Sequence, residues 1–245
     1  MLSMTKRLVR DQLAARGYQV RWVGLRSSVT GVDFWHDVRV LLRDPAGAQF
    51  IDVGANVGQS IEAIRIEFTE PRIISFEPGP ETFRRLKTLH GQTAGVQLEQ
   101  AALGDRDGTI PFHLTARTDS HDTSVSDSIL ASTEYATGEV IDVPIWTLDD
   151  YCARRAITKI DMLKIDAEGY DLHVLRGAGR MLREQRVTCF SVEVLGSSLY
   201  EGQPEFLDFL AFAKSVGYRL NGIYDASYSD DRLHHFNALF IKTAA

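Results

Sequence analysis

The sequence predicts an α/β fold, with a mostly parallel sheet and helices on both of its faces. Short apolar runs alternate along the chain with segments whose apolar residues recur at helical spacing. Strands and helices that alternate in this way favour parallel pairing through crossover connections. With 245 residues, the chain has the length of one such domain.

The first two strand–helix units carry the clearest pattern. An apolar run at 49–54 ends in glycine, and residues 57–68 follow with apolar side chains at helical spacing. A second run at 72–77 precedes Pro80, and proline is favoured at the first position of a helix. We therefore expect strand, tight turn and helix, twice in succession.

The middle of the chain is less regular. Residues 96–103 are expected to form the third strand, and 109–114 an added strand after a turn. Residues 115–139 are rich in Ser, Thr, Asp and Ala and hold few large apolar side chains. Long excursions of this kind in compact domains are typically lids or mobile segments.

The second half returns to regular alternation. Thr147 starts a helix signal, because a Thr followed three residues later by an acid is typical of a helix N-terminus. The last two strands are joined by a polar loop, which predicts an antiparallel terminal pair. Expected strands are 140–146, 161–166, 187–194, 218–224 and 237–242, and expected helices are 171–183 and 204–216.

Residues 1–48 are predicted to be an N-terminal extension to a domain at 49–245. The extension is expected to begin with a helix that places Leu8 and Leu13 on its apolar face. An irregular stretch around Phe34 is expected to follow.

Composition and charge exclude several classes of protein. The formal net charge is −6, which does not suit phosphate backbones, so no nucleic-acid partner is expected. No segment approaches the roughly 20 apolar residues of a membrane span, and no signal-peptide run is visible, so we expect a cytoplasmic protein without a membrane partner. Two cysteines, Cys152 and Cys189, do not indicate a disulfide framework or a cysteine-based metal site.

Ligands of open α/β sheets bind beyond the carboxyl ends of the strands, so candidate residues are sought there. The first strand ends in the loop 52–60, which lacks the second glycine of a dinucleotide fingerprint and the lysine of a phosphate loop. The second ends at Glu77, 23 residues after Gly54, where an acidic residue typically accepts hydrogen bonds from ribose hydroxyls. A plain glycine turn and a helix-start carboxylate are the alternatives.

A charge cluster ends another expected strand. Lys164, Asp166 and Glu168 stand at alternate positions, so an extended chain would place them on one face. Charges at the end of a buried strand are costly unless they are paired or line a cleft, which favours a site over a solvated rim. Glu193 closes the next strand and should reach the same cleft. A carboxylate there could take the proton of an alcohol.

His235 precedes the last strand, and an antiparallel terminal pair would return it to the same edge of the sheet. It is a candidate base, with a solvated or structural histidine as the alternative. A magnesium site on Asp166 and Glu193 is left open, because carboxylates are the ligands that Mg²⁺ prefers.

Five motifs in order resemble the FkbM family of S-adenosylmethionine-dependent methyltransferases. The similarity runs from about residue 49 to 194 and continues weakly at 237–240. The motifs are Phe50-Ile-Asp-Val-Gly-Ala-Asn-Val-Gly58, Phe76-Glu-Pro78, Ala101-Ala-Leu-Gly-Asp105, Thr147-Leu-Asp-Asp150 and Lys164-Ile-Asp-Ala-Glu-Gly169.

The resemblance implies a class I methyltransferase (Rossmann-like) fold, with a seven-stranded, mostly parallel sheet whose last strand is antiparallel. It also implies O-methylation of a hydroxyl on a sugar, glycan or secondary metabolite. By the family pattern, Glu77 would hold the ribose, and Ala102 and Leu103 would border the adenine. The expected cofactor contacts are Asp52, Gly54, Ala55, Asn56, Gly58, Gln59, Ser60, Glu77, Ala102, Leu103 and Asp166; the candidate catalytic residues are Asp166, Glu168 and His235.

Two alternatives remain at this point: a nicotinamide-dependent oxidoreductase and a cofactor-binding protein without catalysis. The altered glycine loop speaks against the first, since it lacks the approach that a pyrophosphate needs. The expected partner is a small-molecule or glycan acceptor. The acceptor's identity, a homodimer, and the roles of residues 1–48 and 115–139 are left open.

Overall fold

A computed structural model describes residues 31–43, 46–115, 127–133, 137–229 and 231–243. The chain divides into two compact units, Met1–Val32 and Asp33–Ala245. The helix expected around Leu8 and Leu13 lies outside the described residues. All elements below belong to the second unit.

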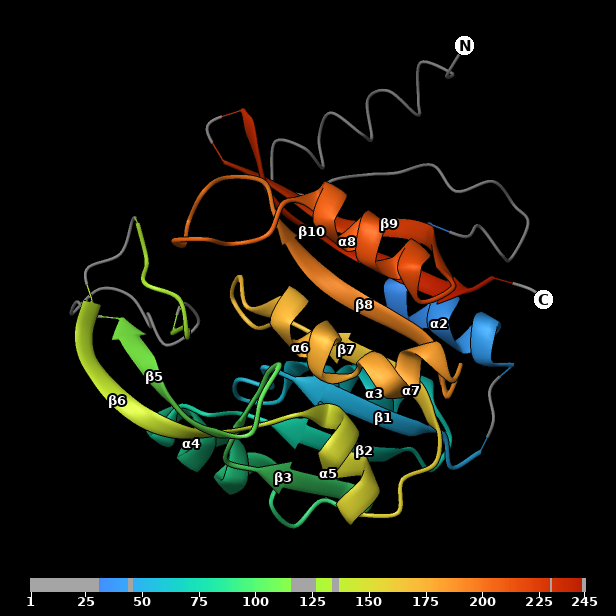
Figure 1. Ribbon diagram of the computed structural model, residues 1–245. Coiled ribbons are helices and arrows are strands. Elements are labelled where there is room, and N and C mark those ends of the chain that lie inside the picture. The colour runs from blue at the N-terminus through green and yellow to red at the C-terminus, as the bar shows by residue number, and fades with distance from the viewer. Residues whose placement is uncertain (1–30, 44–45, 116–126, 134–136, 230, 244–245) are drawn as a thin grey trace, which may run out of the picture. The chain divides into compact units, whose positions relative to one another are not determined.

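A seven-stranded sheet runs through this unit (Figure 1). Its strands lie in the order β3-β2-β1-β7-β8-β10-β9; β10 is antiparallel to both of its neighbours, and the other pairs are parallel. This confirms the expected seven-stranded, mostly parallel sheet whose last strand in the chain is antiparallel. The strands are β1 (Gln49–Val53), β2 (Arg72–Phe76), β3 (Val96–Glu99), β7 (Ile160–Ile165), β8 (Val187–Leu195), β9 (Tyr218–Ser229) and β10 (Arg232–Lys242).

Helices cover both faces of the sheet, as expected (Figure 1). In β1, Ile51 and Val53 belong to one buried cluster and Phe50 to another on the opposite face, because successive side chains of a strand point to opposite faces. The Phe50 cluster includes residues of α2 (Phe34–Leu42), α3 (Gln59–Glu67) and α4 (Pro80–His90). The Ile51 cluster includes residues of α5 (Leu148–Arg154), α6 (Asp171–Gly177), α7 (Gly179–Arg183) and α8 (Phe206–Ser215).

The stretch around Phe34 is a helix, α2, where the sequence indicated irregular structure. The Asp33 carboxylate caps it by accepting the His36 N–H at 2.9 Å. Phe34, Val38 and Leu42 are buried at helical spacing. Since α2 falls in the second unit, that unit begins before residue 49; the assignment of 1–48 as an extension stays a prediction.

The strand expected at 96–103 is interrupted. β3 ends at Glu99, and β4 (Ala102–Leu103) instead pairs with β6 (Thr137–Trp146) in a second sheet, completed by β5 (Gly108–Thr115). The helix expected at 171–183 is likewise divided at Ala178 into α6 and α7. The helix start at Thr147 is confirmed, because its hydroxyl accepts the Asp150 N–H at 3.3 Å.

Candidate active site

A cavity of about 390 Å³ opens at the carboxyl ends of β1, β2, β7 and β8. The strand order reverses between β1 and β7, which is the position where ligands bind in open α/β sheets. The volume of the cavity falls in the range of small-molecule sites, roughly 300–1,000 Å³. Ten of the predicted site residues line it: Gly54, Ala55, Asn56, Gln59, Ser60, Glu77, Ala102, Leu103, Asp166 and Glu168.

The glycine turn after β1 is shaped by close backbone contact. Gly54 has φ +76°, and a Cβ at this position would lie 1.8 Å from the Asp166 carbonyl oxygen. Gly58 has φ +103° at the start of α3, and a Cβ there would lie 2.3 Å from the His90 ring. Gly54 lines the cavity, whereas Gly58 shapes the turn from outside it.

Asp52 does not line the cavity; it supports the turn from within the sheet. Its carboxylate is fully buried, and Oδ2 accepts a hydrogen bond from the Ser75 hydroxyl at 3.2 Å. Its Oδ1 lies 3.9 Å from the Lys164 ammonium. Burial raises the pKa of Asp52, and the Lys164 charge opposes that rise.

Glu77 joins the first two loops. Its Oε2 accepts the Asn56 N–H at 3.0 Å, and its Oε1 accepts the Gly79 N–H at 2.8 Å. Burial raises the pKa of Glu77 to about 7, against the effect of these two hydrogen bonds. The predicted ribose acceptor is therefore a buried carboxylate held at the edge of the cavity.

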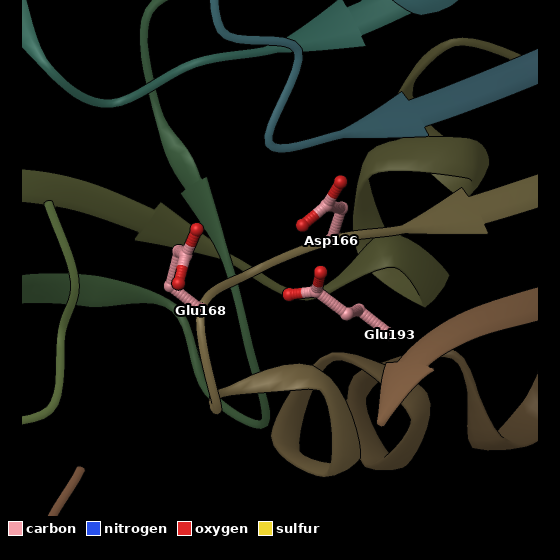
Figure 2. A group of neighbouring side chains, drawn as sticks. All are labelled: Asp166, Glu168 and Glu193. Carbon is pink, nitrogen blue, oxygen red and sulfur yellow. The ribbon is translucent and has the colours of Figure 1, made fainter. Parts of the chain in front are cut away.

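Three carboxylates from two strand ends face a common space (Figure 2). One oxygen from each of Asp166, Glu168 and Glu193 lies within 4.8 Å of the others. The Lys164 ammonium donates to Asp166 Oδ2 at 2.9 Å. Burial, reinforced by Asp166, raises the pKa of Glu168 to about 8 and that of Glu193 well above its usual value.

A fourth carboxylate, missed at the level of sequence, holds this cluster in place. Asp171 is fully buried in the first turn of α6 and accepts the N–H groups of Ala167 and Glu193, each at 3.2 Å. Burial raises its pKa to about 7. An acid in the first turn of a helix is common, so its position alone gave no signal.

His235 is not among the residues that line the cavity. Its Nδ1 lies 4.0 Å from Glu193 Oε1 and 3.0 Å from His234 Nδ1. Partial burial, with the neighbouring His234 charge, lowers the pKa of His235. The structure thus brings His235 close to the carboxylate cluster without bringing it to the cavity.

Residues outside the predicted set complete the cavity wall. Phe112, Asp127 and Ile129 line it, and the last two come from the excursion expected at 115–139. This segment had no periodic pattern that could have placed individual side chains. The cavity therefore has a largely apolar wall beside Ala102 and a strongly acidic one beside Glu168.

The family model described as "Methyltransferase FkbM domain" matches residues 52–220. The chain belongs to the FkbM methyltransferase family. The matched residues include the glycine turn, Glu77 and the carboxylate cluster. S-adenosylmethionine is accordingly the methyl donor, as the resemblance to this family implied, and the nicotinamide alternative is not favoured.

Three named methyltransferases are similar to this chain over 54% to 74% of its length. The 2-O-methyltransferase NoeI of Sinorhizobium fredii is 26% identical over 188 residues, which cover 74% of this chain and 76% of NoeI. The hexuronic acid methyltransferase AglP of Haloferax volcanii is 26% identical, over 64% of this chain and 60% of AglP. The 31-O-demethyl-FK506 methyltransferase FkbM of Streptomyces tacrolimicus is 28% identical, over 54% of this chain and 59% of that protein.

Solved methyltransferase structures are also similar to this FkbM-family chain. Magnesium protoporphyrin IX methyltransferase from Synechocystis matches with a TM-score of 0.47 at 9% identity, over 97% of both chains. A TehB-like methyltransferase from Corynebacterium glutamicum matches with a TM-score of 0.43 at 14% identity, over 98% of this chain and 97% of the other. Within the described part of the chain, no helix has both the length and the apolar character needed to cross a bilayer.

Proposed function

We propose that this protein transfers the methyl group of S-adenosylmethionine to a hydroxyl of a sugar, glycan or secondary metabolite, and that Glu168 takes the hydroxyl proton. The observation that carries the proposal is the acidic end of the cavity, where Asp166, Glu168 and Glu193 converge beside the glycine turn. An O-methyltransferase needs both a donor site and a proton acceptor, and this cavity offers residues for each.

The residues that line the cavity suit the cofactor in polarity and in charge. Ala102, Leu103 and Phe112 give an apolar surface for a purine, and Glu77 offers two carboxylate oxygens to ribose hydroxyls. The acidic wall suits the positive charge of a sulfonium. The Gly54 turn brings backbone rather than a side chain to the cavity, which leaves room for the methionine portion.

S-adenosylmethionine supplies an electrophilic methyl on a positively charged sulfur. As the acceptor oxygen bonds to that carbon, the carbon–sulfur bond breaks, its electron pair stays on sulfur, and the hydroxyl proton passes to Glu168. A pKa of about 8 suits this task, since a base works best when its pKa lies near the working pH. We assign the base to Glu168 rather than His235, because Glu168 lines the cavity and His235 does not.

The acceptor class is supported by the names of the relatives. NoeI is named as a 2-O-methyltransferase, AglP as a hexuronic acid methyltransferase and FkbM as a 31-O-demethyl-FK506 methyltransferase. Hydroxyl groups of sugars or complex natural products fit these names, and we propose the same class for this chain.

The test of the function is a panel of hydroxylated acceptors incubated with S-adenosylmethionine carrying a labelled methyl. Nucleotide sugars, glycans, polyketides and unmodified RNA form its arms. Label in a base-stable ether on a sugar or polyketide acceptor supports the proposal. Label confined to RNA or to an amine would contradict it.

A divalent metal is the alternative use of the acidic wall, since carboxylate oxygens are the ligands that Mg²⁺ prefers. The Lys164 ammonium, 2.9 Å from Asp166 Oδ2, favours a cluster balanced by the protein's own cation and by protons. Adding a chelator to the acceptor panel distinguishes a metal site from a proton-accepting cluster. Full activity in the chelator supports the proton-acceptor proposal, whereas loss that Mg²⁺ restores would assign the cluster to a metal.

The Glu77→Gln variant is expected to bind S-adenosylhomocysteine about 10- to 100-fold more weakly. A hydrogen bond to a charged group contributes roughly 1.5 to 3 kcal/mol, and each 1.4 kcal/mol is about tenfold in affinity. Because the pKa of Glu77 is about 7, the parent should bind more tightly at pH 8 than at pH 6, and the variant should lose this dependence. Calorimetric titration at both pH values measures the two effects.

Glu81→Gln is the matched control for Glu77. Glu81 lies on the same helix start, is partly exposed and does not line the cavity. The Glu81→Gln variant should bind S-adenosylhomocysteine with the same affinity as the parent. Equal affinity of Glu77→Gln and the parent would assign Glu77 a role in the helix start alone.

A further inference from the structure

The turn that carries Glu168 has an uncommon backbone conformation. Glu168 has φ +48° and Gly169 has φ +86°, so two successive residues lie in the left-handed region. A non-glycine residue is found there at a cost of about 1 to 3 kcal/mol unless its surroundings hold it in place. The Ser128 hydroxyl provides one such contact by donating to the Glu168 carbonyl at 2.7 Å.

Tyr200 holds the side chain of the same residue. Its hydroxyl donates to Glu168 Oε2 at 2.7 Å, and the tyrosine is 2% exposed. Hydrogen bonds to an ionised carboxylate are shorter and stronger than those between neutral groups. One oxygen of Glu168 is therefore fixed, and Oε1 is the oxygen that we expect to accept a proton.

The loop after β8 is braced so that Tyr200 stays in this position. Gln203 Oε1 accepts the N–H groups of Leu199 and Tyr200, each at 2.9 Å, and Gln203 Nε2 donates to the Ser197 carbonyl at 2.7 Å. A functional group whose own position is locked by neighbours holds its partner more accurately than a mobile one. Tyr200 is thus set by its loop before any ligand binds.

The tyrosine ring also packs directly against the turn. A Cβ added to Gly169 would lie 3.2 Å from Tyr200 Cδ2 and 3.3 Å from Leu130 Cδ1. The segment that holds Leu130 is itself bonded to the Tyr200 loop, because Glu201 donates its N–H to the Ala131 carbonyl at 2.9 Å. Two loops far apart in the sequence therefore enclose the Glu168 turn.

Tyr200 acts against the other groups around Glu168. Burial raises the pKa of Glu168, and carboxylates from its own turn, α6, the segment at 127–133 and β8 oppose its ionisation further. The Tyr200 hydrogen bond lowers that pKa. The surrounding carboxylates are those of Asp166, Asp171, Asp127 and Glu193.

We infer that Tyr200 is a positioning residue for methyl transfer: its hydroxyl holds Glu168 Oε2 so that Oε1 faces the acceptor hydroxyl. This inference rests on the assignment of Glu168 as the proton acceptor in the proposed function. Tyr200 itself does not line the cavity and takes no proton.

The Tyr200→Phe variant tests the inference. Single-turnover transfer to a validated acceptor should slow about tenfold, the effect of one lost hydrogen bond to a charged group, while affinity for S-adenosylhomocysteine stays at the parent value. The acidic limb of the rate–pH profile should also move to higher pH, because the ionised carboxylate loses a donor. Tyr228→Phe, at an exposed tyrosine of β9, is the matched control and should leave the rate and the profile unchanged.

A double variant separates this inference from the proposed function. If Glu168 is the base, Glu168→Gln is slow and adding Tyr200→Phe slows transfer no further. A Glu168→Gln variant that transfers at the parent rate would overturn the proposed function. A slow Glu168→Gln variant with a parent-like Tyr200→Phe variant would overturn the inference alone.

A second variant keeps the test open if Tyr200→Phe unfolds below the assay temperature. Gln203→Ala then replaces it, since this variant removes the hydrogen bonds that hold the Tyr200 loop in place and keeps the phenol. The same shift of the acidic limb to higher pH is then expected. A slower rate without any shift would show that the loop is needed only for folding and would overturn the inference.

Discussion

Replacing Glu168 with glutamine is expected to slow single-turnover methyl transfer by about 100-fold or more, since general base catalysis typically contributes at least that factor. The amide keeps the size of the side chain and its hydrogen bond from Tyr200 but cannot take a proton. Affinity for S-adenosylhomocysteine should stay within a few fold of the parent. Rapid-quench measurement with a saturating cofactor, beside a calorimetric titration, gives both values.

The rate–pH profile gives a second readout of the same variant. In the parent, transfer should accelerate with rising pH up to about pH 8, because Glu168 accepts a proton only when ionised. The positive sulfonium should lower the midpoint in the complex. Glu168→Gln should lack this rise of the rate with pH.

His235→Ala is the control and should retain the parent profile, because His235 lies outside the cavity wall. A 100-fold loss of rate in His235→Ala together with a parent-like rate in Glu168→Gln would assign the base to His235.

Substituting alanine for Gly54 is expected to destabilise the fold by about 2 to 5 kcal/mol and to abolish measurable cofactor binding. The estimate combines roughly 1 to 2 kcal/mol for a left-handed backbone with 1 to 3 kcal/mol for overpacking. Its Cβ would lie 1.8 Å from the Asp166 carbonyl oxygen, which cannot move without separating the ends of β1 and β7. Denaturant unfolding measures the stability, and titration with S-adenosylhomocysteine measures the binding.

Gly47→Ala is the matched control for backbone strain. Gly47 has φ +73°, close to the +76° of Gly54, yet a Cβ there would meet no described atom within 4 Å. The Gly47→Ala substitution should lower the free energy of unfolding by only about 1 to 2 kcal/mol and leave cofactor affinity unchanged. If the two alanine variants lost the same stability and bound the cofactor equally, the close contact at Gly54 would carry no functional weight.

The parts of the site that lie at strand ends could be predicted from the sequence. The apolar runs identified β1, β2 and β7, and the carboxyl ends of parallel strands meet at one edge of a sheet. Gly54, Glu77 and Asp166 were therefore expected together, and the cavity joins them. The spacing between Gly54 and Glu77 gave a further, chemical reason to expect Glu77 at the site, because an acidic residue at that distance typically binds ribose hydroxyls.

Contacts between loops could not be predicted in the same way. Tyr200 and Glu168 are 32 residues apart and meet only because two irregular segments pack together. Asp127 comes from a segment without periodic apolar residues, so no sequence pattern indicated which way its side chain would point. Asp171 resembled an ordinary helix-start acid until its bonds to Ala167 and Glu193 were known.

A crystal structure of the protein with S-adenosylhomocysteine tests the proposed donor site directly. We expect both ribose hydroxyls within hydrogen-bond distance of the Glu77 carboxylate and the adenine against Ala102 and Leu103. The sulfur should face the space between Asp166, Glu168 and Glu193. A cofactor whose ribose contacts another residue, or whose sulfur faces away from these three carboxylates, would contradict the proposed donor site.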